Sequence, residues 1–215
     1  RQRQMCIRDR KSAILHDIGA LKLQQLPDAE DLDDGTKEVV KKNTQETLAR
    51  YGDLDEEVLR LITQMQELYT RESDAEIPAA LKESVNANIL YVADAYDRMT
   101  AMKSFEEPTS EVKAVRELLA DEERYNKKIV NALIHGISIL YPGVCVELTN
   151  GEKGLVITEN EDNIFEPIVL DFRNNNLYDL SDPSVKQTVE IADVMKTMDN
   201  RIKLDKSLLE EYQAN

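Results

Sequence analysis

Residues 12–23 read SAILHDIGALKL and place His16 directly before Asp17 at the end of an apolar helical run. Neighbouring side chains on a helix point about 100° apart, so these two could bind one metal ion only where the helix ends or distorts. Gly19 follows two residues later, at a position where helices often stop. The stretch therefore predicts a helix end that carries either a metal site or a hydrogen-bonded, helix-terminal pair.

The apolar spacing that follows predicts further helices up to about residue 140. Pro78 is expected to open the longest of them. We assign its apolar face to Ile89, Val92, Ala93 and Tyr96. The acidic stretch 26–35 is interpreted as a solvated connector, because its carboxylates lack the spacing of a calcium loop. The predicted helices cover residues 11–24, 36–52, 54–69, 79–102, 111–122 and 125–140.

The pattern changes after residue 140. Val144, Val146 and Leu148 alternate with polar residues, which is the period of a strand, and Asn150-Gly151 predicts a type I′ hairpin turn. The predicted fold class is mainly α, a helical bundle followed by a small antiparallel β unit. Further short strands are expected at 154–159, 167–172 and 176–180, and a terminal helix at 205–213.

Composition limits the classes of partner. A net charge of −15 argues against nucleic-acid polymers and anionic membranes, which require a basic surface. No apolar run approaches the ~20 residues that span a bilayer. Cys6 and Cys145 lie far apart and make no disulfide framework, which fits a reducing, cytoplasmic location.

The first ten residues, RQRQMCIRDR, differ in charge from the acidic remainder of the chain. We interpret residues 1–10 as a non-native leader and exclude them from the functional reasoning. The predicted organisation is then a helical domain over 11–140, incomplete at its N-terminus, and a β extension with a terminal helix over 141–215.

Two motifs carry a family resemblance. LHDIG at 15–19 is followed about 75 residues later by VADAYDRMT at 92–100. Together they resemble the HD phosphohydrolase superfamily, and most closely its HD-GYP branch, the cyclic di-GMP phosphodiesterases of bacterial signalling. Residues 140–156, LYPGVCVELTNGEKGLV, also resemble the strand extension that often follows such domains. The resemblance implies an HD-type helical bundle over residues 11–140.

The resemblance also implies a site. His16 and Asp17 match the His-Asp metal signature of the family, and Asp94 matches its later aspartate ligand. The implied metal is Fe or Mn, which carboxylate and imidazole ligands suit. Lys103 and Phe105 stand where the family has the Arg and Tyr of its RPY segment, so Lys103 is the candidate phosphate contact.

The departures from the family pattern are equally specific. Ala20 replaces the lysine that follows HDIG, and Asn43 stands at the isolated histidine. The His-His-Glu block falls on residues 65–67 or 68–70, and the Gly-Tyr-Pro motif is reduced to residues 76–78. The whole chain contains two histidines, so three further histidine ligands cannot follow LHDIG. The family's first histidine would lie upstream of this motif.

Two functions follow as hypotheses. The first is a degenerate HD-GYP-like signalling protein that acts by binding, with a cyclic dinucleotide or another phosphoester as ligand and a signalling protein or a second copy as partner. The alternative is an active metal-dependent phosphohydrolase. In that case His16, Asp17 and Asp94 hold the metal, and Lys103 contacts the phosphate of an ester other than the usual cyclic dinucleotide.

Other candidate residues have plainer interpretations. We expect Asp97 to be a solvated helix residue and Glu67 a surface charge. His135 is interpreted as a satisfied core or helix-end histidine, and Tyr91 and Tyr96 as core residues.

Overall fold

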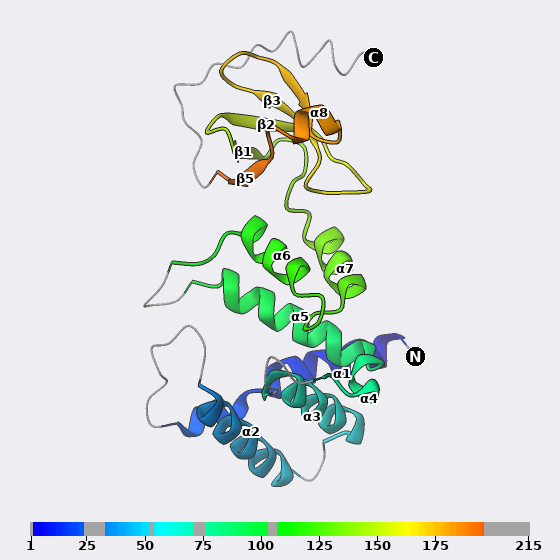
Figure 1. Cartoon of the computed structure of the whole chain (residues 1–215). Helices are drawn as coiled ribbons and strands as arrows, with labels where there is room; N and C mark the ends of the chain where they lie inside the picture. Colours follow the sequence, from blue (N-terminus) through cyan, green and yellow to red (C-terminus); the bar gives the residue numbers. More distant parts are fainter. Residues whose placement is uncertain (1, 24–32, 52–53, 71–75, 103–106, 196–215) are drawn as a thin grey trace. The chain divides into compact units, whose positions relative to one another are not determined.

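The computed structural model describes residues 2–23, 33–51, 54–70, 76–102 and 107–195 (Figure 1). The chain divides into two units, the first formed by residues 1–109 and 117–132 and the second by 110–116 and 133–215. The second unit thus takes in short helical segments that the sequence pattern groups with the helical domain. Over the described residues the class is mainly α, with a small antiparallel sheet in the C-terminal part. No helix among these residues is long and apolar enough to cross a membrane.

Most helices follow the predicted spacing, but the first does not, because α1 begins at Gln2 and ends at Leu15 where one helix over 11–24 was predicted. Their bounds are α1 Gln2–Leu15, a 3₁₀ helix η1 Ile18–Lys22, α2 Asp34–Ala49, α3 Glu56–Thr70, α4 Ala79–Lys82, α5 Val85–Thr100, α6 Glu111–Ala120 and α7 Lys127–Ile137.

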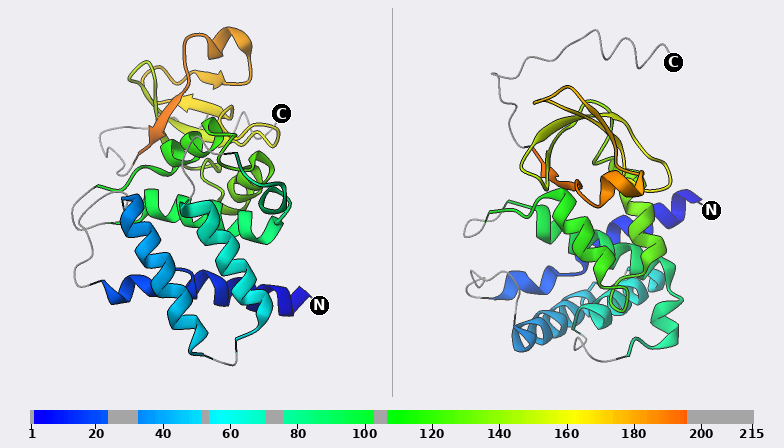
Figure 2. Two further views of the ribbon diagram at one scale, coloured as in Figure 1. Left: turned by 60° about the horizontal axis from the view of Figure 1, so that its bottom comes forward. Right: turned by 45° about the horizontal axis from the view of Figure 1, so that its top comes forward.

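Helix α3 is central to the first unit. It contacts α1, α2 and α5, and Figure 2 shows it crossing α1. Its buried side chains recur at helical spacing, so one face packs inward along its whole length. Val58 and Ile62 form a core cluster with Leu48 of α2, against which Leu15 and Ile18 pack. Burying each such side chain contributes roughly 1.5–3 kcal/mol, which fixes the end of α1 against α2 and α3.

The predicted helix over 79–102 is in fact two helices, α4 and α5. The break lies at Glu83 and Ser84, and the buried Asn88 side chain explains it. Its Nδ2 donates to the backbone oxygens of Leu81 at 2.7 Å and Ser84 at 2.8 Å. Both carbonyl oxygens also accept backbone hydrogen bonds, from Ser84 N and Asn88 N respectively, so the Asn88 amide adds a second bond at each side of the break.

The predicted apolar face of α5 is partly wrong. Ile89 is 47 % exposed, and Ala93 is also exposed. The residues that pack inward lie on a face rotated from the predicted one. The contacts of α5 with α3 and α4 decide which side of it is covered, and the spacing of its apolar residues alone does not show this. The buried residues of α5 are Ala87, Asn88, Leu90, Tyr91, Val92 and Ala95.

The second unit contains a five-stranded antiparallel sheet in the order β4-β3-β2-β1-β5. Strands β1 to β4 coincide with the predicted strands, whereas β5 and α8 were not predicted. The predicted terminal helix at 205–213 lies outside the described residues. The bounds are β1 Cys145–Leu148, β2 Lys153–Thr158, β3 Ile168–Asp171, β4 Leu177–Asp179, α8 Pro183–Lys186 and β5 Ile191–Val194.

The hairpin between β1 and β2 is not the predicted type I′ turn. That turn needs positive φ at both central residues, and Asn150 is not among the described residues that have it. The loop has three residues instead, closed by Leu148 N donating to Glu152 O at 2.8 Å. Gly151 has φ +80°, the left-handed position of a three-residue loop.

Helix α6 holds β5 through two cationic side chains within the second unit. Arg116 Nη2 donates to Ile191 O at 2.5 Å, and its guanidinium carbon lies 5.1 Å from the centroid of the Phe165 ring. Lys113 Nζ lies 3.3 Å from Asp193 Oδ2.

Candidate functional site

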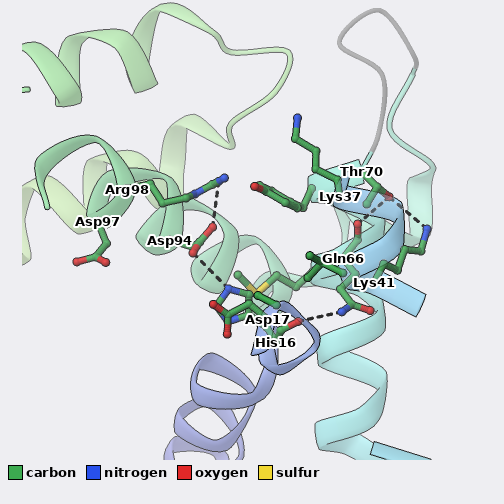
Figure 3. Close-up of a pocket in the computed structure, with 13 residues that line it drawn as sticks. His16, Asp17, Lys37, Lys41, Gln66, Thr70, Asp94, Asp97 and Arg98 are labelled. Atoms are coloured by element: carbon green, nitrogen blue, oxygen red, sulfur yellow. Dashed lines mark hydrogen bonds and ion pairs between the residues drawn. The ribbon is translucent and has the colours of Figure 1, made fainter. Parts of the chain in front are cut away.

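The first unit contains a cavity of about 350 Å³ where the end of α1, α2, α3 and α5 meet (Figure 3). A cavity of this size is adequate for a small organic ligand. It is lined by His16, Asp17, Ala20, Lys37, Val40, Lys41, Met65, Gln66, Tyr69, Thr70, Asp94, Asp97 and Arg98.

The helix predicted over 11–24 ends earlier than its predicted bounds, at LHDIG. Helix α1 ends just before His16, whose backbone N donates to Ser12 O at 3.0 Å, and His16 and Asp17 form the turn before η1. Two contacts then fix His16. Its Nδ1 lies 2.8 Å from Ala13 O, and its own carbonyl oxygen accepts from Gln66 Nε2 at 2.9 Å. Since Nδ1 is engaged with a carbonyl oxygen, Nε2 is the ring atom that faces the cavity.

Gly19 is required by the close approach of η1 to α2. A Cβ atom there would lie 2.2 Å from Val40 O and 2.4 Å from Thr44 N, distances that no side chain permits. Its backbone N donates to Thr44 Oγ1 at 3.0 Å. Asn43, at the position of the family's isolated histidine, donates from Nδ2 to Gly19 O at 3.4 Å and does not line the cavity.

His16, Asp94 and Arg98 form a chain of charged contacts. His16 Nε2 lies 3.3 Å from Asp94 Oδ1, and Arg98 Nη2 lies 3.0 Å from Asp94 Oδ2. Figure 3 shows the Asp94 carboxylate between the other two side chains. Burial lowers the pKa of His16, but the Asp94 carboxylate, aided by the charge of Asp17, outweighs it, so this pKa lies above its ordinary value. Both oxygens of Asp94 are therefore engaged with cationic or potentially cationic partners.

The three predicted metal ligands line the same cavity. His16 and Asp94 are in contact, whereas Asp17 is exposed at the edge. In the described part of the chain no group of three or more His, Cys, Asp or Glu side chains is arranged to hold a metal ion. The donor set therefore does not fit a complete metal site as these residues stand, and ligation by the three residues remains a prediction.

Three cationic side chains also line the cavity, Lys37 and Lys41 from α2 and Arg98 from α5, and sequence reasoning missed them. Lys37 Nζ lies 5.4 Å and the Arg98 guanidinium carbon 4.3 Å from the centroid of the Tyr69 ring. Lys41 Nζ donates to Thr70 Oγ1 at 3.2 Å. The available signals were the four-residue spacings of Lys37 with Lys41 and of Asp94 with Arg98, which place each pair on one helix face.

The positions that the resemblance gives to the His-His-Glu block also reach the cavity. Met65, Gln66, Tyr69 and Thr70 of α3 all line it. Glu67 is exposed and does not, so its interpretation as a surface charge is confirmed. Lys103 and Phe105 lie outside the described residues.

The plainer interpretations hold in most cases. Tyr91 is 1 % exposed and stacks on Tyr125 with ring centroids 5.4 Å apart, so it is a core residue. Tyr96 is only half-buried. His135 is exposed in the last turn of α7, which confirms the helix-end alternative and excludes the core one. Asp97 is exposed at the edge of the cavity.

Comparison with known proteins finds no similar sequence or structure. No protein-family model, no curated protein and no solved structure matches this chain. The residues of the cavity are therefore the basis on which a function can be proposed.

Proposed function

We propose that the first unit is a degenerate HD-GYP-like domain that acts in signalling by binding a phosphorylated small molecule, without turning it over. The observation that carries this proposal is the state of Asp94. Its two oxygens face His16 Nε2 at 3.3 Å and Arg98 Nη2 at 3.0 Å. A carboxylate paired in this way is a weaker metal ligand, because a metal would have to displace the arginine or share the charge.

The placement of the motif positions supports the proposed ancestry. Residues 15–19, the α3 positions 65–70 and Asp94 of α5 are far apart in the sequence, yet all contribute to one cavity. In the family that the chain resembles, these positions would build one metal centre. Here Met65, Gln66, Tyr69 and Thr70 occupy the α3 wall, and none of them is a histidine or a carboxylate, the ligands of the family's His-His-Glu block.

The alternative, a metal-dependent phosphohydrolase, has one observation in its favour. A separation of 3.3 Å between His16 Nε2 and Asp94 Oδ1 is also what two ligands of one ion would show with bonds of about 2.1 Å. The metal would then be held by His16, Asp17 and Asp94, and would supply Lewis-acid chemistry to a phosphoester. Lys103 is the phosphate contact in this alternative.

Metal content and turnover separate the two functions. The purified chain is analysed for Fe, Mn and Zn, and hydrolysis of cyclic di-GMP and p-nitrophenyl phosphate is measured with each metal added. Under the binding proposal, metal is far below one equivalent and turnover equals that of Asp94→Ala. The matched control is Glu67→Ala, which removes an exposed carboxylate outside the cavity. One equivalent of metal with turnover that Asp94→Ala abolishes and Glu67→Ala retains would establish the enzyme instead.

A further inference from the structure

We propose that the hairpin loop between β3 and β4 binds a calcium ion, with Asp171 Oδ2 and Asn175 Oδ1 as its side-chain ligands. This loop belongs to the second unit. The inference is therefore independent of the function proposed for the cavity of the first unit.

Asp171 is a fully buried carboxylate at the end of β3. It is 0 % exposed, and the alternation of a strand places it on the same face as Val169, which is also 0 % exposed. Its Oδ1 accepts from Arg173 N at 2.9 Å. Its Oδ2 is buried and has no hydrogen-bond partner in the described part of the chain. An unsatisfied buried acceptor costs about 1–3 kcal/mol, and more when it is charged, so this oxygen requires a partner.

The same loop contains a second buried oxygen of this kind. Asn175 Oδ1 is also buried and without a hydrogen-bond partner among the described residues. Asn175 N donates to Asp171 O at 3.0 Å, and Asp171 N donates to Asn176 O at 2.9 Å, so the backbone brings residues 171 and 175 together. Asn175 has φ +56°, a left-handed conformation that asparagine tolerates better than most residues. One tight turn thus contains two acceptor oxygens that no donor satisfies.

A hard cation satisfies two such oxygens at once. Carboxylate and side-chain amide oxygens are both ligands of Ca²⁺, which completes its shell with backbone carbonyl oxygens and water. Calcium accepts irregular geometry at about 2.3–2.6 Å, whereas Mg²⁺ demands a near-ideal octahedron at about 2.0–2.1 Å and keeps several waters. A short loop with two oxygens shielded from solvent therefore suits calcium better.

The ligand set also predicts the strength of binding. The pair supplies one carboxylate, and the described residues include no cluster of three or more acidic, histidine or cysteine side chains. Calcium affinity rises with the number of charged ligands, so a Kd of about 10⁻⁴–10⁻³ M is expected. The net charge of −15 favours the approach of cations in general. A test must therefore separate this loop from weak binding elsewhere on the surface.

Amide NMR of the full chain provides that separation. CaCl₂ is titrated into metal-free protein, with MgCl₂ and NaCl at equal ionic strength as comparisons. The backbone amides of Arg173 and Asn176 should shift saturably with Ca²⁺, with the Kd given above. Mg²⁺ should bind at least about tenfold more weakly, and Na⁺ should give no saturable shift.

Two variants test the two ligands separately. Asp171→Asn should abolish the saturable shift. Asn175→Gly keeps a residue suited to the left-handed backbone and removes Oδ1, so it tests the site even where the first variant unfolds. It should weaken calcium binding at least about tenfold, since even the outer partners of metal ligands contribute about 10–100-fold. Asp162→Asn is the matched control, because Asp162 is exposed in the loop that precedes β3, at the opposite end of that strand. It should leave the titration unchanged.

Three other results would overturn the proposal. If Ca²⁺ gives no saturable shift in the loop, the two oxygens are satisfied within it, as when the Asn175 amide rotates so that Nδ2 donates to Asp171 Oδ2. Calcium shifts that persist in both variants would place the ion elsewhere in the chain. Equally tight binding of Mg²⁺ would exclude a site selective for calcium.

Discussion

The backbone of Gly19 lies so close to Val40 that a Cβ on the glycine would be 2.2 Å from the valine carbonyl oxygen. This contact packs η1 against α2 and so fixes the position of His16 and Asp17, which lie between α1 and η1. The glycine of LHDIG is therefore a packing requirement of the cavity wall, in addition to its role as a helix stop.

Gly19→Ala is expected to destabilise the first unit by about 1–3 kcal/mol, the usual effect of forcing an atom into a filled site. Urea unfolding followed by far-UV circular dichroism measures it. Gly136→Ala on α7 is the matched control, since a Cβ there meets nothing within 4 Å. In a helix that change should stabilise by roughly 0.5–1 kcal/mol. Equal stabilities of the two variants would show that η1 can move away from α2 without loss.

The contact between His16 and Asp94 predicts a pH dependence. The folded-state pKa of His16 is raised, so its stabilising contribution is fully present below the unfolded value of about 6.5 and is lost as pH rises through the folded value. Proton NMR titration should place the pKa of His16 above its ordinary value, and Asp94→Asn should lower it. An unchanged His16 pKa in that variant would mean that Asp94 is not its main partner in solution.

The core of the first unit gives another prediction. Arg124 Nε donates to Tyr91 Oη at 2.7 Å, and Tyr91 is 1 % exposed. Tyr91→Phe removes this acceptor beside a partly buried guanidinium and should destabilise by about 1–3 kcal/mol. Tyr51→Phe, at a residue that is 63 % exposed, should stay within about 0.5 kcal/mol. The comparison is made by urea unfolding, and equal midpoints for both variants would contradict the assigned hydrogen bond.

Sequence patterns predicted the structural features that depend on residues close together in the chain. The alternation of Val146 and Leu148 depends on neighbours in the chain and was predicted correctly, and the break of the first helix was predicted near LHDIG but placed a few residues too late. Strand β5 was missed because its burial does not alternate. Its position depends on pairing with β1, where Val146 lies opposite Val194 and Leu148 opposite Ile191. Such long-range pairing leaves little trace in four residues of sequence.

The same distinction applies to the cavity. His16 and Asp94 could be selected from motifs, because each lies in a recognisable local pattern. Lys37, Lys41 and Arg98 belong to the site only because α2 and α5 each meet α3, which no local pattern encodes. Asn43 is the opposite case. Its sequence position matches a site residue of the family, but its side-chain amide donates to the Gly19 carbonyl oxygen.

Arg116 is expected to stabilise the second unit by tying β5 to α6. Its Nη2 donates to Ile191 O at 2.5 Å, and a hydrogen bond from a charged donor contributes about 1.5–3 kcal/mol. Arg116→Met keeps much of the aliphatic stem over Phe165 and removes the donor, so the loss should fall in that range. It should also speed amide hydrogen exchange along β5. Arg173→Met is the control in the same unit, because Arg173 is 81 % exposed and its ion pair with Glu152 spans 3.7 Å. If both variants exchange alike along β5, the arginine does not hold this strand.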